Sequence, residues 1–182
     1  MRLHIPSLKE AKELLATPPQ FHGHVVFADA LPPAVLLEKA IASDDHFWLM
    51  PRLYLDDESG QVVGSGGFKF APRNRRVEIG YGVSAAFRCR GHSTEGVKLL
   101  TDEAFASGLV DGVDADTAQC NHASQRVLEK AGFMNYGSGE DADGPLFLWK
   151  KERPNKSSDS TASAGTSAAE QPRVPASAAS HL

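Results

Sequence analysis

The sequence is poor in cysteine and has no long hydrophobic run. Among its 182 residues only Cys89 and Cys120 are cysteines, which is too few for a disulfide framework or a zinc-finger ligand set. A reducing, cytoplasmic location is therefore expected. No apolar stretch approaches the roughly 18 residues that a membrane-spanning helix needs, and the N-terminal residues lack the apolar segment of a signal peptide. We therefore expect no membrane association.

The chain also lacks an excess of positive charge. Its Lys and Arg residues number 19 against 23 Asp and Glu, which gives a formal net charge of -4 and a pI near 6.0. Proteins that bind nucleic acids generally are usually strongly basic, so nucleic acid is not an expected partner. The length suffices for one domain with a hydrophobic core.

The C-terminal part differs in composition from the rest. From about Glu152 the chain consists mainly of Pro, Ser, Ala and Thr with almost no large apolar side chain. Such a segment buries too little apolar surface to offset the conformational entropy lost on ordering. We therefore expect a folded domain over residues 1–151 and a disordered tail over residues 152–182.

A strand followed by a long helix forms the most informative part of the sequence. Residues 77–83 alternate between larger apolar side chains and Glu or Gly, which predicts a strand with one buried face. Between Val97 and Phe105 the apolar residues follow the spacing of an amphipathic helix. Gly108 is suited to end this helix in the left-handed conformation.

The turn between this strand and helix is basic and contains glycine. Arg88, Arg90 and Gly91 lie in it, directly before the predicted helix. The N-terminus of a helix offers unpaired backbone N–H groups and a partial positive charge, both of which attract anions. The turn is therefore predicted to bind phosphate, although ordinary solvated arginines are the alternative.

The remaining pattern predicts a mixed α/β fold. A hairpin precedes the strand at 77–83, and a further strand after the long helix completes a βαβ unit, which must be parallel and right-handed. The expected elements are helices at 7–15 and 34–42, strands within 47–55 and 61–70, a strand at 112–118, a helix capped by Asn121 and ended by Gly132, and a strand at 144–150.

Two motifs resemble those of the GNAT superfamily of acetyl-CoA-dependent N-acetyltransferases. Residues 88–93, Arg-Cys-Arg-Gly-His-Ser, resemble the family's Arg/Gln-x-x-Gly-x-Gly/Ala pyrophosphate loop, with Ser93 where Gly or Ala is usual. Residues 121–133, which begin Asn-His-Ala-Ser and end Val-Leu-Glu-Lys-Ala-Gly-Phe, are similar to the branch of ribosomal-protein N-terminal alanine and serine acetyltransferases. The order and separation of the motifs match as well, and the resemblance covers roughly residues 47–150.

The resemblance implies a splayed mixed sheet flanked by helices, with acetyl-CoA as co-substrate and no metal. Acetyl-CoA would lie between the strand at 77–83 and the strand after the long helix. Its pantetheine would pair with backbone near 81–83 and its diphosphate with N–H groups of 88–93. The coenzyme-binding residues are thus expected to be Tyr81, Gly82, Val83, Arg88, Cys89, Arg90, Gly91, His92, Ser93 and Asn121.

The catalytic residues implied by the resemblance are Glu78 and Ser124. Acetyl transfer needs a base for the amine and a proton for the leaving thiolate. Glu78 resembles by position the glutamate that several GNAT enzymes use as base, but it is equally expected as a carboxylate paired with Arg75 or Arg76. Ser124 resembles the proposed proton donor of the ribosomal-protein branch, and its alternative is a helix-cap residue. Tyr136 is a weaker candidate for the acid.

The expected acceptor is a primary amine, on either a protein N-terminus or a small molecule. An α-amine titrates near roughly 7.7–8.0 and a lysine amine near about 10.4, so the modest set of polar residues favours α-amines or other amines of low pKa. Residues 21–46 are expected to contact the acceptor, and the protein is expected to be a monomer or homodimer. His22 and His24 lack further clustered ligands, so they do not predict a metal site.

Two other functions are alternatives to acetyl transfer. One is a non-catalytic acyl-CoA-binding sensor, with which the Ser93 departure is compatible. The other is a different nucleotide binder, which the lack of a Walker Lys-Ser/Thr pair and of a Rossmann glycine triplet disfavours.

Overall fold

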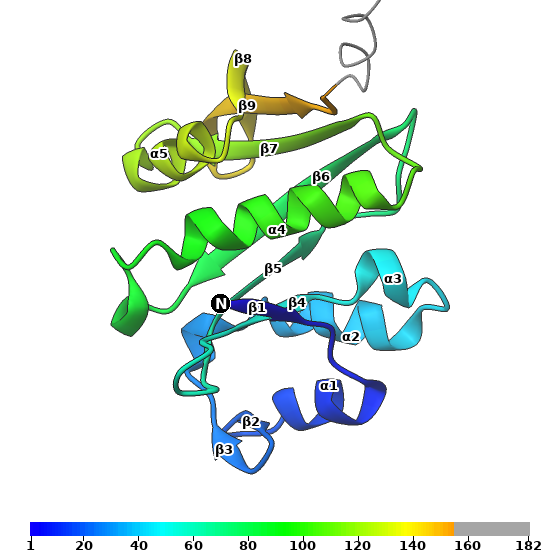
Figure 1. Ribbon diagram of the computed structural model, residues 1–182, viewed down its shortest axis with the longest axis vertical. Coiled ribbons are helices and arrows are strands. Elements are labelled where there is room, and N and C mark those ends of the chain that lie inside the picture. Colours follow the sequence, from blue (N-terminus) through cyan, green and yellow to red (C-terminus); the bar gives the residue numbers. More distant parts are fainter. Residues whose placement is uncertain (155–182) are drawn as a thin grey trace, which may run out of the picture.

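The computed structural model of the protein describes residues 1–154, which form a mixed sheet with helices on both faces (Figure 1). The seven-stranded sheet has the order β1-β4-β5-β6-β7-β9-β8, which confirms the predicted α/β class. Its strands are β1 (Arg2–His4), β4 (Arg52–Leu55), β5 (Val62–Phe68), β6 (Arg76–Val83), β7 (Gly112–Ala118), β8 (Met134–Asp141) and β9 (Gly144–Glu152), and a separate hairpin contains β2 (Gln20–Phe21) and β3 (His24–Val25).

The helices divide between the two sides of the sheet. The long helix α4 packs on β5 and β6, and α5 lies beside it (Figure 1). The helices of the N-terminal part gather near β4 and β5. These N-terminal helices are α1 (Leu8–Leu14), η1 (Ala28–Ala30), α2 (Ala34–Ala42) and α3 (His46–Leu49). The later helices of the chain are η2 (Ala85–Phe87), α4 (His92–Ala106) and α5 (His122–Lys130).

Strands β6 and β7 run parallel and then separate. Their ladder covers residues 76–78 of β6 and 112–114 of β7, although β6 continues to Val83 and β7 to Ala118. Beyond the ladder, β6 remains paired with β5, and β7 remains paired with β9. The expected splay is therefore present, and we call the space between the diverging ends of β6 and β7 the splay gap.

One face of β6 packs against α4. Val77 and Ile79 are buried in a cluster with Val97 and Ala104 of α4, because alternate side chains of a strand point to the same face. This packing is the buried face that the alternation at 77–83 predicted. The opposite face carries Glu78 and the glycines of the strand.

The local signals for helix ends are confirmed. Gly91 and Gly108 flank α4 with φ angles of +88° and +73°, values that glycine adopts without steric cost. At the start of α5 the Asn121 Oδ1 accepts a hydrogen bond from the Ser124 N–H at 3.1 Å. Gly132, with φ +86°, ends α5, and the Phe133 N–H donates to the Leu128 carbonyl at 3.0 Å, as in a Schellman motif.

The segment around Phe47 differs from the prediction. Residues 46–49 form the short helix α3, and the strand begins only at Arg52. Arg52 is fully buried and forms an ion pair with Glu103 of α4 at 2.6 Å. Its guanidinium also lies 4.7 Å from the centroid of the Phe68 ring. An apolar run in sequence does not distinguish a strand from a buried helical turn, which explains the error.

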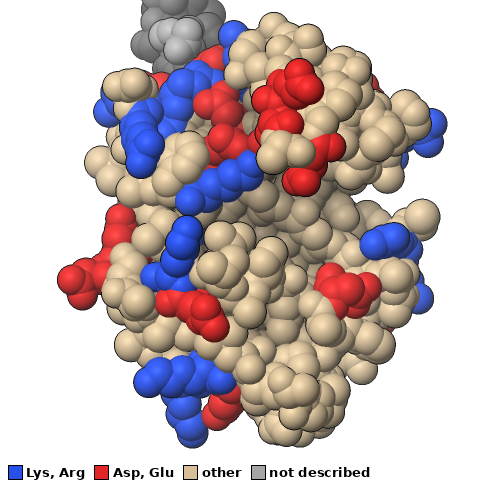
Figure 2. All heavy atoms as spheres, turned by 180° about the vertical axis from the view of Figure 1, so that it is seen from behind, with Lys and Arg blue, Asp and Glu red and all other residues tan. Residues whose placement is uncertain are grey.

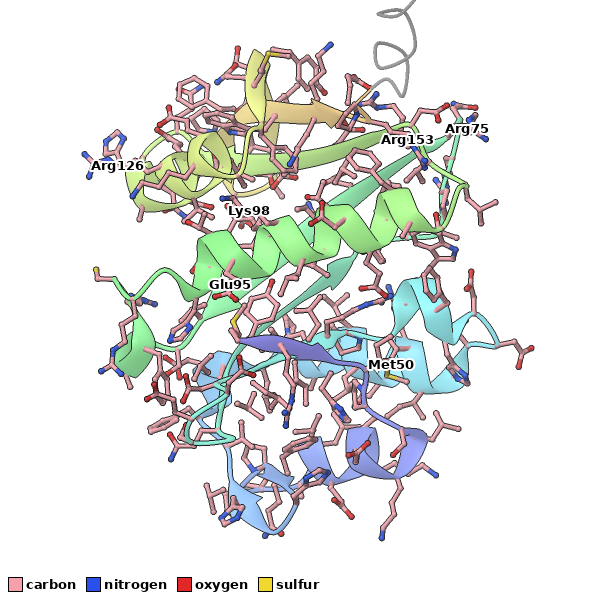
Figure 3. The ribbon with its side chains drawn as sticks, in the orientation of Figure 1. Met50, Arg75, Glu95, Lys98, Arg126 and Arg153 are labelled. Carbon is pink, nitrogen blue, oxygen red and sulfur yellow. The ribbon has the colours of Figure 1, made fainter. Side chains whose placement is uncertain are left out.

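The folded part continues past the predicted boundary at residue 151. Glu152 is the last residue of β9, and the Arg153 side chain donates to the Val110 carbonyl at 2.7 Å. Arg75 and Arg153 lie at the same corner of the molecule, where both face Asp111 (Figure 3). The rest of the predicted tail, residues 155–182, lies outside the described residues. Within the described chain, no helix has the length and apolar character to cross a membrane.

Candidate active site

Helix α4 begins with an open N-terminus. Its N-cap is Gly91, and no side chain caps the helix. The Glu95 N–H returns to the Gly91 carbonyl at 3.0 Å, so the N–H groups of residues 92–94 have no protein acceptor within residues 1–154. These groups and the helix dipole create a site suited to an anion. His92 and Ser93, which the sequence analysis placed in the preceding turn, lie in this first turn of the helix.

The basic turn before α4 adds positive charge. Arg88 and Arg90 form no ion pair with any residue of the described chain, and the Arg90 guanidinium lies 5.6 Å from the centroid of the Phe87 ring. Cys89, between them, is exposed and has a φ of +61°. The turn therefore places unpaired arginines beside unpaired N–H groups, which fits the two negative charges of a diphosphate. Coenzyme binding by these residues stays a prediction.

Tyr81 and Ser124 meet across the splay gap. The Tyr81 hydroxyl lies 2.7 Å from Ser124 Oγ and donates to the Ser124 carbonyl oxygen at 3.2 Å. Burial raises the pKa of Tyr81 to about 12, against the opposing effect of the Ser124 hydrogen bond. The tyrosine thus stays neutral at physiological pH. Ser124 is at once a cap residue through its N–H and a partner of Tyr81 through its hydroxyl.

Asn121 lies at the splay gap, whereas Tyr136, the other candidate acid, lies away from it. Asn121, at the start of α5, lies on the far side of the gap from β6, where its side chain holds the Ser124 N–H. Tyr136 is on the edge strand β8, is 53% exposed and stacks with Lys150. Strands β7 and β9 separate Tyr136 from β6. The structure therefore brings Ser124, but not Tyr136, to Tyr81.

Glu78 belongs to a cluster of charges where β6 and β7 begin to separate. Its carboxylate pairs with the Lys69 ammonium, which also binds Asp116 Oδ2 at 2.7 Å. Burial raises the pKa of Glu78, and the nearby Asp116 raises it further. The Lys69 ammonium acts in the opposite direction but does not cancel the increase. Burial works in the same direction on Asp116, but hydrogen bonds to Lys69 and Glu78 outweigh it and lower the pKa of that carboxyl.

This cluster corrects the expected partners of Glu78. Arg75 pairs with Asp111, and Arg76 pairs with Asp114 at 2.6 Å, so neither arginine pairs with Glu78. Lys69 takes that place because it lies opposite Glu78 directly after the end of β5, where its N–H donates to the Glu78 carbonyl at 2.8 Å. The sequence contained no local signal for this pairing, which depends on the register of β5 and β6.

A groove lies over the face of β5 and β6 opposite α4, and we call it the glycine groove. Its volume is about 430 Å³. Figure 2 shows this side of the molecule hollowed, with mostly uncharged residues along the hollow. Its floor is formed by the strands and its wall by η1, α2 and α3. The lining residues are Asp29, Leu31, Pro32, Pro33, Leu36, Lys39, Leu49, Pro51, Ser65, Gly66, Gly67, Phe68, Lys69, Gly80, Tyr81 and Gly82.

The segment η1 connects the glycine groove to the basic turn. Asp29 of η1 accepts a hydrogen bond from the Ala85 N–H of η2 at 2.8 Å. Next to it, the rings of Phe27 and Phe87 pack edge to face with their centroids 5.8 Å apart. Asp29 also lines the groove, and η2 leads directly into the turn at residues 88–91. The glycine groove and the basic turn are therefore linked by a continuous set of contacts.

A second cavity, of about 510 Å³, lies beside the β2–β3 hairpin. His22 Nε2 and His4 Nε2 lie 2.7 Å and 3.2 Å from the same carboxylate oxygen of Glu10, which places these histidines in a side-chain network. Among residues 1–154 no group of His, Cys, Asp or Glu side chains has the arrangement of a metal site.

Comparison with known proteins identifies related sequences. The family described as "Acetyltransferase (GNAT) domain" matches residues 18–134. The Bacillus subtilis (strain 168) protein "Uncharacterized N-acetyltransferase YjdG" is 34% identical over 85 residues, which cover 44% of this chain and 49% of that protein. "Probable N-acetyltransferase YjcK" of the same organism is 41% identical over 59 residues, 32% of this chain and 33% of that protein. The matched region spans half or less of these relatives.

Solved structures share the fold. Ribosomal-protein-S5-alanine acetyltransferase from Vibrio fischeri superposes with a TM-score of 0.62 at 14% identity, over 82% of this chain and 91% of that chain. The Microcin C7 self immunity acetyltransferase MccE, in complex with acetyl-CoA and AMP, has a TM-score of 0.61 at 19% identity, over 83% and 91%. Aminoglycoside acetyltransferase AAC(6')-Ib, in complex with coenzyme A, has a TM-score of 0.59 at 18% identity, over 83% and 94%.

Proposed function

Because the chain belongs to the GNAT acetyltransferase family, we propose that it transfers the acetyl group of acetyl-CoA to a primary amine. The observation that carries this proposal is the open N-terminus of α4, with its unpaired N–H groups and arginines, placed beside the splay gap. An anion at the helix and an extended ligand arm in the gap would be held at the same time. An acyl-CoA has both of these parts.

The coenzyme would be bound mainly by backbone groups. The N–H groups of residues 92–94 and the side chains of Arg88 and Arg90 would hold the diphosphate. Among residues 1–154 no strand lies beside the edge of β6 at residues 81–83 on the gap side, so its backbone would pair with the pantetheine. Ser93 is small and carries a hydroxyl donor, which suits a phosphate oxygen.

The chemistry assigned to the site is direct transfer. The amine nitrogen would attack the thioester carbonyl carbon, forming the N–C bond, and the C–S bond would then break. Glu78, directly or through water, would take the proton that the nitrogen loses, and Ser124 would supply a proton to the thiolate. A backbone N–H near Val83 would stabilise the oxyanion. The raised pKa of Glu78 supports its role, since a base works best with a pKa near the working pH.

Ligand binding and thiol release test this function in two steps. Differential scanning fluorimetry and calorimetry with acetyl-CoA are expected to show stabilisation and saturable heat, whereas ATP and NAD at equal concentration are not. Release of free CoA thiol is then measured over a panel of amines. Binding without any amine-dependent release would favour the acyl-CoA sensor over the enzyme. No stabilisation by any CoA species would contradict the coenzyme site itself.

Substitutions at Glu78 and Ser124 test the assigned roles. We expect Glu78→Gln to lower kcat and to remove the acid limb of the pH–rate profile, and Ser124→Ala to lower kcat by about 100-fold, the lower end for acid catalysis. Both variants should bind acetyl-CoA normally. Glu129→Gln, at an exposed carboxylate on α5, serves as control. Unchanged turnover in either variant would remove that residue from the mechanism.

A further inference from the structure

We infer that the acceptor is a small molecule with one amine on an apolar body, held in the glycine groove, and that polycationic amines are poor acceptors. This inference rests on the proposed function and adds to it the chemical class of the acceptor. It depends on three features of the groove: its shape, the side chains that line it, and the way its charges are already paired.

The floor of the groove is kept open by glycine. A Cβ placed on Gly82 would meet no atom within 4 Å, and one placed on Gly80 would meet only the Lys69 side chain, at 4.0 Å. Side chains at these positions would fit the fold and would occupy the groove. The space above β6 is therefore left for a ligand, and about 430 Å³ is a size that suits small molecules.

The wall of the groove is mostly apolar. Leu36 of α2 is 49% exposed although it is a large hydrophobic residue, and it shares the lining with apolar residues of α3 and of the segment between η1 and α2. An apolar ligand would remove these surfaces from water, whereas hydroxyl and ammonium groups would lose hydration without finding partners. The apolar lining residues that keep exposed surface are Leu31, Pro32, Pro33, Leu36 and Leu49, whereas Pro51 and Phe68 are buried.

The charged groups of the lining give little attraction to additional cations. Lys69 is paired with Glu78 and Asp116. Asp29 accepts the Ala85 N–H, and this hydrogen bond lowers the pKa of its carboxyl, which therefore stays negatively charged. Lys39 has no ion-pair partner among the described residues and keeps its positive charge on the wall. The lining thus contains one carboxylate, Asp29, and two ammonium groups, Lys39 and Lys69, so a second ammonium group on the acceptor would meet a net positive charge.

The amine itself has a place at one end of the groove. Lys69 lines the groove and holds the Glu78 carboxylate, so the groove leads to the proposed base. An apolar body along Leu36 and Leu49 would direct its single amine toward this end. An amine at the Lys69 end of the groove would also face the splay gap, where the thioester would lie.

An amine panel and one pair of variants test the inference. Thiol release is measured with 2-phenylethylamine and leucinamide, and with kanamycin and spermidine as polycations. We expect kcat/KM to be at least about tenfold higher for the apolar monoamines, because the polycations must desolvate charges without partners. Kanamycin or spermidine reacting equally well or faster would overturn the inference.

The variant Leu36→Asp places a charge in the apolar wall. It should lower kcat/KM for 2-phenylethylamine by about tenfold or more, with acetyl-CoA affinity unchanged. Val35→Asp is the matched control, because Val35 is the neighbouring residue on α2, is 54% exposed and does not line the groove. Equal loss in both variants, or no loss in Leu36→Asp, would overturn the inference.

Failure of the proposed function can be separated from failure of this inference. If no amine releases thiol, the transferase proposal fails, and binding of 2-phenylethylamine to the CoA-loaded protein is then measured by calorimetry. Saturable binding that Leu36→Asp abolishes and Val35→Asp retains would support the groove as a site for apolar monoamines. Absence of such binding would overturn it.

Discussion

At the scale of residues, Tyr81 is the side chain that joins the two sides of the splay gap near the proposed chemistry. Its hydroxyl is fixed by Ser124, on the helix that follows β7, and its pKa of about 12 keeps it neutral. Tyr81 is therefore suited to orient the Ser124 hydroxyl. It is not suited to act as a base itself.

Replacement of Tyr81 by Phe tests this orienting role. Without its partner, the Ser124 hydroxyl can rotate away, so we expect kcat to fall by about tenfold, less than for removal of the hydroxyl itself. The KM for acetyl-CoA should change little, because the backbone of β6 remains. Tyr136→Phe, on the exposed strand β8, is the control. A kcat equal to that of wild type would show that Ser124 needs no positioning by Tyr81.

The carboxylates around Lys69 predict a pH effect. Asp116 contributes to the raised pKa of Glu78, while Lys69 opposes the increase. In Asp116→Asn the negative neighbour is lost and Lys69 interacts with Glu78 alone, so the pKa of Glu78 should fall. If ionised Glu78 is the base, activity is lost as the pH falls through this pKa. The acid limb of kcat/KM should therefore move to lower pH in Asp116→Asn, and a limb that stays or moves upward would contradict the assignment.

Residue-level prediction from sequence succeeded where the signal was local. The cap at Asn121 and the left-handed glycines at Gly108 and Gly132 follow from neighbouring residues alone. The pairing of Lys69 with Glu78 depends instead on which residues of different strands lie opposite each other. A sequence without strand register does not contain that information.

At the scale of elements, helix α4 is held to the sheet by a buried ion pair as well as by apolar packing. Arg52 of β4 is fully buried, and its Nη2 lies 2.6 Å from Glu103 Oε1 of α4. The same guanidinium donates to the Met50 carbonyl at 2.7 Å. This arrangement fixes the position of α4 against β4, and with it the N-terminus that faces the basic turn.

Removal of the acidic partner should destabilise the fold. Glu103→Ala would leave the Arg52 charge buried without its carboxylate, which costs about 3 kcal/mol or more. Asp102→Ala, at an exposed position on the same helix, should change stability by less than about 0.5 kcal/mol. Urea unfolding followed by circular dichroism measures both values. Similar free energies of unfolding for the two variants would contradict a stabilising role for the pair.

Elements with strong periodicity were predicted and elements with weak periodicity were not. The βαβ unit of β6, α4 and β7 follows from a clear change of period in the sequence. Strand β8 is almost entirely exposed and contains Gly137 and Gly139, so it lacks the alternation that identifies a half-buried strand. Its place in the sheet comes from pairing with β9.

At the scale of the whole molecule, the family motifs point to particular residues for the proposed coenzyme site but to none for the proposed acceptor site. Residues 88–93 and 121–133 carry recognisable patterns, and the structure places both at the splay gap. The glycine groove is assembled from the separate segments 29–39, 49–51 and 65–82. Residues 21–46 were expected to contact the acceptor, but which of them line the glycine groove depends on how the N-terminal helices fold over β5 and β6.

The contact between η1 and η2 has a thermodynamic consequence for the order in which ligands are bound. Asp29 touches both the groove and the segment that leads to the basic turn. If a coenzyme at the turn restrains η2, and through it η1, the acceptor will meet a wall that is already ordered. Linkage then requires reciprocity, since any factor by which acetyl-CoA tightens the acceptor is the factor by which the acceptor tightens acetyl-CoA. Kinetically, such a molecule favours loading of both partners into one ternary complex before either product departs.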